Sequence, residues 1–199
     1  MSRAVSRRVV WVLLGALPSV VHCESHKQAD GDGAAREDRV EPALGVLGNV
    51  PDAPALLGSG AQAPDFLALA HTGAKVHLQD LIDKPVLLVF YEANGSKAAA
   101  SVLAKLADAW LLLQPKLEMV VTVGPHNAVE QAAYATEKQW PFVFLADPDG
   151  ALARAYGVGH AKAPAVSVLV GPDRKIIDAG PSRADEAHRI EGLLDSRER

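Results

Sequence analysis

Cysteine is almost absent from this sequence, because Cys23 is the only one among 199 residues. A single cysteine excludes a disulfide within one chain and any metal site built on several thiolates. Thiol redox chemistry needs a thiolate as nucleophile, and no other side chain cycles through sulfenic acid or a disulfide. From residue 24 to residue 199 the sequence therefore offers no group for such chemistry.

Lysine and arginine form no run beyond the first eight residues, and the formal net charge is −4. Because nucleic-acid-binding proteins usually carry a basic patch, no nucleic-acid partner is expected. Hydrophobic residues make up 49% of the sequence, and charged residues 22%. This composition predicts one core of about 100–150 residues with additional tails.

The N-terminal region has the pattern of a targeting segment. Arg3, Arg7 and Arg8 precede the apolar stretch Val9–Val21. This stretch is shorter than the about 20 residues that a membrane-spanning helix needs. We therefore expect a signal peptide over residues 1–23 and an exported protein, in the periplasm or anchored in the cell envelope.

Cys23 directly follows the apolar stretch, in an arrangement that resembles a bacterial lipoprotein signal. The resemblance implies that an acylated Cys23 becomes the first residue of the mature protein and anchors it in a membrane. Such signals usually have Gly, Ala or Ser before the cysteine, where this sequence has His22. Plain cleavage and an uncleaved anchor are the alternatives.

Residues 24–60 are rich in Gly, Ala, Pro, Asp and Glu and show neither helical nor strand periodicity. A segment of this composition has too little apolar surface to order itself, so it predicts a flexible linker.

From residue 61 onward, strand and helix patterns alternate. Val86–Tyr91 is a continuous apolar run, typical of a strand buried on both faces. Ser96 is the predicted N-cap of a helix that continues to about Leu113, before Gln114 and Pro115. Further strands are expected at 75–78, 117–123, 142–146, 166–170 and 175–178, and further helices at 128–139, 151–156 and 183–194.

This order of elements predicts an α/β fold. We expect a thioredoxin-like three-layer α/β/α sandwich with a mixed central sheet over residues 61–195, followed by a charged tail at 196–199.

Four phrases are similar, in order and spacing, to signatures of the peroxiredoxin family of alkyl hydroperoxide reductases and thiol-specific antioxidants. They are Ala63–Phe66, Val86–Tyr91, Pro141–Gly150 and Ala155–Val158. The resemblance covers about two thirds of the chain and implies a thioredoxin fold, with thiol peroxidase chemistry and no cofactor.

The sequence departs from the family where its chemistry would lie. In that family the central strand leads into Pro-x-x-x-Thr-x-x-Cys, where a helix N-terminus and an arginine lower the pKa of the thiol. Compared with this pattern, Glu92 stands at the proline and Ser96 at the threonine. Ala99 stands at the peroxidatic cysteine and Ala165 at the supporting arginine. The expected catalytic set is therefore missing.

A second alignment, to the CxxC loop of thioredoxins, puts Gly95 and Ala98 at the two cysteines, so it supplies no thiol either. Ser96 beside Lys97 raises the alternative of a serine nucleophile. However, neighbouring residues point about 100° apart on a helix, and no G-x-S-x-G motif is present. The N-cap role is therefore favoured for Ser96.

Other polar residues give no strong motif. The histidines, without H-E-x-x-H or Cys/His spacing, are expected in solvent rather than in a metal site; those considered are His71, His77, His126 and His160. Asp147–Gly150 resembles a fragment of a calcium loop but is too short for one, so it predicts a turn. Lys162 and Arg154 are candidates to replace the missing arginine as an anion contact.

Two functions follow from these observations. The first is a non-catalytic binding or scaffold module that takes an unidentified protein or small-molecule ligand near Tyr91–Ala99 or at the sheet edge. The second is an oxidoreductase that uses the thiol of a partner protein. Trp110 or Trp140 could mark the face of a homodimer, although large aromatic residues more often belong to a core.

Overall fold

A computed structural model describes residues 45–46, 52–53 and 55–197. The predicted signal peptide, the lipidation candidate Cys23 and most of the predicted linker lie outside the described residues.

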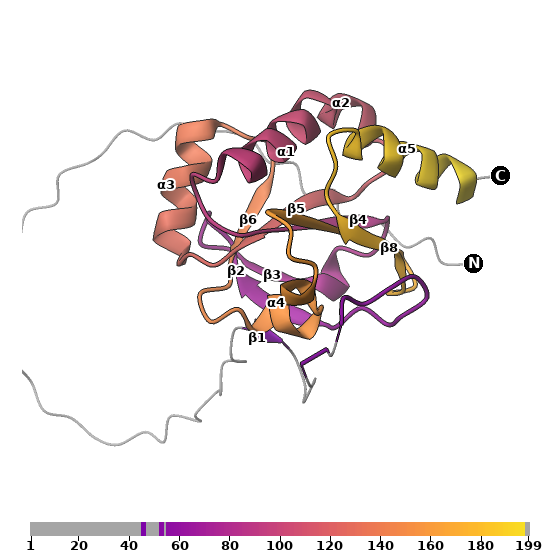
Figure 1. Ribbon diagram of the computed structural model, residues 1–199, viewed down its shortest axis with the longest axis horizontal. Coiled ribbons are helices and arrows are strands. Elements are labelled where there is room, and N and C mark those ends of the chain that lie inside the picture. Colours follow the sequence, from indigo (N-terminus) through magenta and orange to yellow (C-terminus); the bar gives the residue numbers. More distant parts are fainter. Residues whose placement is uncertain (1–44, 47–51, 54, 198–199) are drawn as a thin grey trace, which may run out of the picture. The chain divides into compact units, whose positions relative to one another are not determined.

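A mixed five-stranded sheet forms the centre of the fold (Figure 1). Its strand order is β6-β5-β4-β7-β8, with β6 at Val143–Ala146, β5 at Met119–Gly124, β4 at Val86–Tyr91, β7 at Ala165–Val170 and β8 at Ile176–Pro181. Strands β4, β5 and β6 are parallel, whereas β7 and β8 run antiparallel to their neighbours. All six residues of β4 are buried, because this strand lies between two others and both of its faces are covered. The mixed sheet and the buried central strand confirm the prediction.

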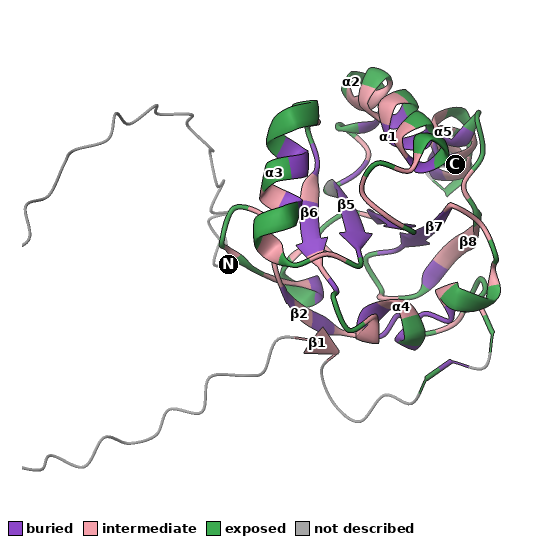
Figure 2. Ribbon diagram, turned by 60° about the vertical axis from the view of Figure 1, so that its left-hand side comes forward, coloured by how far each residue is buried: buried purple, intermediate pink, exposed green. Residues whose placement is uncertain are grey.

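Alternate residues of β4 enter two separate cores. Leu87, Val89 and Tyr91 pack with the helices α1 (Lys97–Asp108), α3 (Ala128–Lys138) and α5 (Glu186–Arg197). Val86, Leu88 and Phe90 pack on the other face, against β2 (Phe66–Leu69) and α4 (Ala151–Ala155). Figure 2 shows the buried strands between these layers. The fold is therefore the expected thioredoxin-like sandwich.

The layer formed by β2 and α4 contains more strand than the sequence predicts. β2 pairs antiparallel with β1 (Gly45–Val46) and with β3 (Lys75–His77), and β3 leads into the short 3-10 helix η1 (Leu78–Asp80). A second 3-10 helix, η2 (Val158–His160), follows α4.

The described part of the range predicted as a flexible linker contacts the domain. β1 pairs with β2, and Leu57 donates its backbone N–H to the Tyr156 carbonyl across 3.1 Å. Gly157 has a φ of 70°, and a Cβ there would lie 1.9 Å from the carbonyl oxygen of Ala55. Backbone pairing with residues far along the chain orders these segments, although their own composition predicts a linker.

The single helix expected after Ser96 divides at Ala109 into α1 and α2 (Trp110–Leu113). The last helix, expected over 183–194, spans α5 instead, so part of the predicted charged tail is helical. The buried carboxylate of Glu186 accepts the backbone N–H of Arg183 across 3.1 Å and so holds the residues just before α5 to its first turn. Such an acceptor stabilises the first turn of a helix.

Both tryptophans discussed as a dimer face make ring contacts with core residues. Trp110 meets Phe142 edge to face at 6.4 Å, and Trp140 stacks on Phe144 at 6.1 Å between ring centroids. Both tryptophan side chains are partly buried. None of the helices in the described part of the chain is long and apolar enough to cross a membrane.

Candidate functional site

The residues singled out by the sequence meet where β4 ends and α1 begins. Ser96 is the N-cap of α1, as predicted, and its Oγ accepts the backbone N–H of Ala99 across 3.3 Å. The same hydroxyl donates to Oε1 of Glu92 across 2.8 Å. The Ser96 hydroxyl therefore has a donor and an acceptor in place, which is the arrangement of a helix cap with an added carboxylate.

Ala99 and Ala165 come together in the core between the sheet and α1. Ala99 is fully buried and Ala165 is 1% exposed, and both belong to the cluster that contains Tyr91. Ala165 pairs with Tyr91 across β7 and β4. Two methyl groups therefore occupy this part of the fold, and neither is accessible to solvent.

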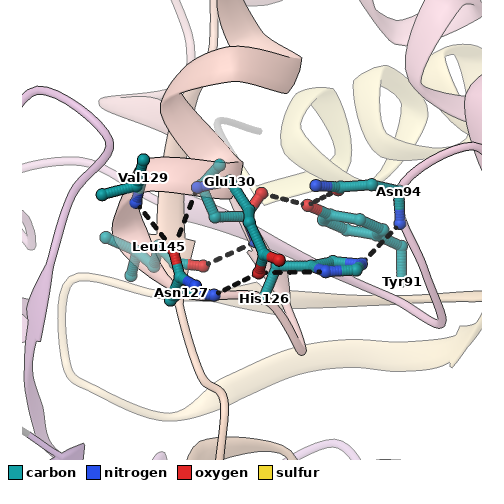
Figure 3. A network of polar contacts seen from close by, with 8 residues as sticks. Tyr91, Asn94, His126, Asn127, Val129, Glu130 and Leu145 are labelled. Atoms are coloured by element: carbon teal, nitrogen blue, oxygen red, sulfur yellow. Dashed lines mark hydrogen bonds and ion pairs between the residues drawn. The ribbon is translucent and has the colours of Figure 1, made fainter.

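Sequence reasoning missed a buried polar network next to this place (Figure 3). The hydroxyl of Tyr91 lies 2.5 Å from Oε1 of Gln131 and 2.8 Å from Oδ1 of Asn94. Gln131 is fully buried, and its Nε2 donates to the carbonyl of Leu145 across 3.3 Å. Burial raises the pKa of Tyr91, although the hydrogen bond with Gln131 lowers it. Tyr91 is thus a neutral hydroxyl that joins β4, α3 and the loop after β4.

The sequence predicted that His126 lies free in solvent. In the structure this side chain instead holds the loop after β4. Its Nε2 accepts the backbone N–H of Asn94 across 2.9 Å, and its Nδ1 lies 3.5 Å from Oε2 of Glu130. Glu130 also accepts the backbone N–H of Asn127, whose side chain caps α3 in return (Figure 3). A ring with an acceptor nitrogen on Asn94 and a donor nitrogen toward Glu130 is a neutral imidazole with its proton on Nδ1.

Two other histidines are bound to the fold as well, which corrects the expectation of solvated side chains. Nδ1 of His71 accepts the backbone N–H of Phe144 across 3.1 Å, and Nε2 of His77 lies 3.0 Å from Asp65. Burial lowers the pKa of His71, and Nδ1 can accept the Phe144 N–H only while it carries no proton. Spacing along the sequence does not reveal these partners. Of the four histidines considered above, His160 is exposed, as expected.

Asp147–Gly150 forms the turn that the sequence predicts. The carboxylate of Asp147 accepts the backbone N–H groups of Leu152 and Ala153, at 3.1 and 2.9 Å, and so caps α4. Burial raises the pKa of Asp147, although these two hydrogen bonds lower it. Within the described residues, no group of three or more His, Cys, Asp or Glu side chains could hold a metal ion.

A pocket of about 250 Å³ opens beside the loop, at the carboxyl ends of β4 and β5. Its apolar wall includes Phe90, Val123 and Val158, and its charged residues are Glu92, Asp147 and Lys162. Arg154, the second candidate for an anion contact, does not line it. Ligands of open α/β sheets commonly bind outside the carboxyl ends of parallel strands, so this pocket is the candidate site.

The comparisons with known proteins agree with the fold. The family model described as "AhpC/TSA family" matches residues 59–179, which is more than half of the chain. The chain belongs to the AhpC/TSA family.

Two curated proteins are similar to the chain. The peroxiredoxin bcp of Haemophilus influenzae is 29% identical over 106 residues, which cover 53% of this chain and 68% of the relative. Its counterpart in Coxiella burnetii is 25% identical over 99 residues, covering 50% of this chain and 66% of the relative. The chain thus spans about two thirds of the length of these relatives.

Solved structures show the same fold. Peroxidoxin BcpB from Mycobacterium tuberculosis aligns with a TM-score of 0.58 at 23% identity, covering 70% of this chain and 97% of that chain. A variant of PrxQ from Xylella fastidiosa aligns with a TM-score of 0.64 at 14% identity, covering 74% and 99%. A DsbE-type thiol:disulfide interchange protein from Chlorobium tepidum aligns with a TM-score of 0.61 at 22% identity, covering 70% and 97%.

Proposed function

We propose that the protein is an exported redoxin-fold module that does not reduce peroxides and that instead binds a protein or small molecule. One observation carries this proposal: Ala99, at the position of the family's peroxidatic cysteine, is a fully buried methyl group. The sequence has no cysteine after Cys23 to replace it. A peroxide needs a thiolate to attack its O–O bond, and neither a methyl group nor a capping hydroxyl supplies one.

The surroundings of Ala99 also disfavour an anion. Glu92 places a carboxylate next to the helix cap, and Ala165 puts a methyl group at the position of the family's arginine. A nearby carboxylate and the loss of a cation both raise the pKa of a thiol. A cysteine introduced at position 99 would therefore be mainly protonated, and replacing Glu92 would remove only one of these two effects.

A binding role is supported by the pocket that remains. It lies at the strand ends where α/β proteins commonly hold ligands, and the loop that borders it is fixed by His126 and Tyr91. A loop with buried hydrogen bonds presents its surface in one conformation, and this lowers the entropy lost on binding.

The proposed location rests on the N-terminal residues. A basic start, a short apolar stretch and Cys23 support export to the periplasm or cell envelope, with a lipid anchor on Cys23. The intact mass of the mature protein tests this. Acylation predicts an N-terminal Cys23 carrying lipid, and Cys23→Ala then releases the protein from membranes. An unmodified mature chain that remains soluble would disprove the anchor.

The alternative function is peroxide reduction with thiols supplied by a partner, and membership of a family that contains peroxiredoxins favours it. In that reaction two partner thiols become a disulfide, while the hydroperoxide yields an alcohol and water. Peroxide loss is measured with a reduced dithiol protein, in the presence and absence of the mature chain. A Cys23→Ser variant is the matched control. We expect no acceleration by either chain, and acceleration by both would establish the alternative.

A further inference from the structure

The pocket at the ends of β4 and β5 has an apolar interior and a charged rim. Phe90 and Val123 belong to the buried core, while Val158 and Ala163 are partly buried side chains packed against it. These groups exclude water from one end of a bound molecule. A ligand of this pocket therefore needs an apolar part.

The charged side chains at the rim differ in how many hydrogen bonds they already make within the protein. Both carboxylate oxygens of Asp147 accept backbone N–H groups, so this carboxylate is committed to α4. Oε1 of Glu92 accepts the Ser96 hydroxyl, while the side chain as a whole is exposed. Lys162 is exposed and makes no hydrogen bond or ion pair with any described residue. One carboxylate and one ammonium group thus remain for a ligand.

Backbone contacts bring these two residues to the same rim. The backbone N–H of Glu92 donates to the carbonyl of Pro164 across 3.1 Å, and Lys162 lies two positions before Pro164. Lys162 also has a φ of 43°, in the left-handed region that residues other than glycine rarely adopt. Residues in this backbone region cluster at ligand sites, and Lys162 lies at the rim of the pocket.

The size of the pocket limits the ligand. A volume of about 250 Å³ corresponds to about eight non-hydrogen atoms at the density of liquid water. We propose that the pocket binds a small zwitterion with an apolar side chain, of the size of a branched-chain amino acid. Its carboxylate pairs with Lys162, its ammonium group pairs with Glu92, and its side chain contacts Phe90 and Val123. This inference rests on the binding role proposed above.

Three probes separate the contributions of the two charges. L-Leucine carries both, 4-methylpentanoate lacks the ammonium group and 3-methylbutylamine lacks the carboxylate. Titration calorimetry on the mature chain measures their affinities. We expect leucine to bind most tightly and each analogue to bind about fivefold more weakly, since an exposed ion pair contributes about 1 kcal/mol.

Matched variants identify the residues involved. Lys162→Gln should lower the affinity for leucine about fivefold and leave the affinity for 3-methylbutylamine unchanged. Glu92→Gln should lower the affinity for leucine and leave the affinity for 4-methylpentanoate unchanged. Lys105→Gln, on the exposed side of α1, should change no affinity, and Ala153→Leu should abolish binding by filling the pocket. Circular dichroism checks that each variant is folded.

The proposal is overturned if leucine does not bind, if leucine and 4-methylpentanoate bind equally, or if the two charge variants keep the natural affinity. These results are independent of peroxide reduction. A chain that is inert toward peroxide but does not bind leucine would disprove the ligand class and leave the non-catalytic role standing. A chain that binds leucine and also consumes peroxide would support the ligand class and disprove the non-catalytic role.

Discussion

Gly124 lies directly against the ring of Tyr91. A Cβ atom on Gly124 would fall 2.3 Å from Cζ of Tyr91 and 2.5 Å from Nε2 of Gln131. The end of β5 therefore has to be a glycine for Tyr91 to reach its buried hydrogen-bond partner. The backbone of β5, the phenol of β4 and the amide of α3 depend on one another at the edge of the candidate site.

Gly124→Ala should destabilise the protein by about 1–3 kcal/mol, because the added methyl group displaces Tyr91 or Gln131 from a packed core. Urea unfolding of the two proteins measures this. Gly180→Ala is the control, since a Cβ on Gly180 meets nothing within 4 Å and should change the stability by less than about 0.5 kcal/mol. Equal effects of the two substitutions would refute the close contact.

Tyr91→Phe should cost about 1–3 kcal/mol of stability, because it leaves Oε1 of the fully buried Gln131 without a donor. Tyr134→Phe is the matched control. The hydroxyl of Tyr134 is buried and makes no hydrogen bond of ordinary geometry with the described residues, although burial raises its pKa and the backbone of Gly95 lowers it. Its removal should therefore cost less than that of the Tyr91 hydroxyl. Thermal or urea unfolding separates the two. If both substitutions cost the same, the network around Tyr91 does not contribute as we describe.

Stability should fall as pH decreases through about 6.5, in part because of His71. Burial lowers the pKa of His71 in the folded state, so the unfolded chain binds a proton first as the solution is acidified. The stability contributed by neutral His71 is fully present above about pH 6.5 and is lost as the pH falls below this value. His71→Asn keeps an acceptor for the Phe144 N–H but does not titrate.

Urea unfolding at several pH values between 5 and 8 tests the role of His71. The His71→Asn protein should lose less stability than the natural protein over this range. His160→Asn, at an exposed loop position, should retain the natural pH dependence. If the stability of His71→Asn depends on pH as strongly as that of the natural protein, His71 does not cause the loss of stability at low pH.

Arg189 should contribute more to stability than an exposed charge does. It donates to Asp178 on β8 and to Glu186, which is 1% exposed, and these hydrogen bonds raise the pKa of Arg189 although burial lowers it. Arg189→Met leaves the Glu186 carboxylate buried without its cation. We expect a loss of about 2–3 kcal/mol, somewhat less than for a fully buried pair.

Lys138→Met is the comparison for Arg189, because the ion pair of Lys138 with Glu137 is exposed and should contribute little to stability. Chemical denaturation of both variants gives the two values. A loss in Arg189→Met no larger than in Lys138→Met would contradict a structural role for the contacts of α5 with β8.

The sequence predicted those parts of the fold that local pattern determines. The continuous apolar run Val86–Tyr91 indicated the central strand, and Ser96 indicated the start of α1. Both signals are contained within a few neighbouring residues. No glycine or proline lies near Ala109, where that helix divides, so the sequence predicted one continuous helix.

Features that need a distant partner could not be predicted in this way. His126 accepts from Asn94, 32 positions earlier, and β1 is ordered by β2, about 20 residues later. The composition of residues 24–60 as a whole predicted a linker, although Ala43–Leu47 around β1 is locally apolar, and composition does not show that a strand edge is available for pairing. The pocket could not be predicted for the same reason, because its rim combines the end of β4 with Lys162, which is distant in the sequence.

We propose that this chain, unlike the peroxiredoxins that share its fold, has no thiol peroxidase activity, because no sulfur stands at position 99. This proposal is tested most directly by the rate of hydrogen peroxide loss with purified Cys23→Ser protein and excess dithiothreitol. A Glu92→Gln/Ser96→Thr/Ala99→Cys variant in the same background, which keeps the Glu92 backbone N–H that donates to Pro164, is the comparison. We predict that the chain without cysteine does not exceed the buffer rate, while the variant consumes peroxide slowly, because its thiol lacks the arginine and lies in a buried position. A rate that rises in proportion to the concentration of the cysteine-free chain would contradict the account.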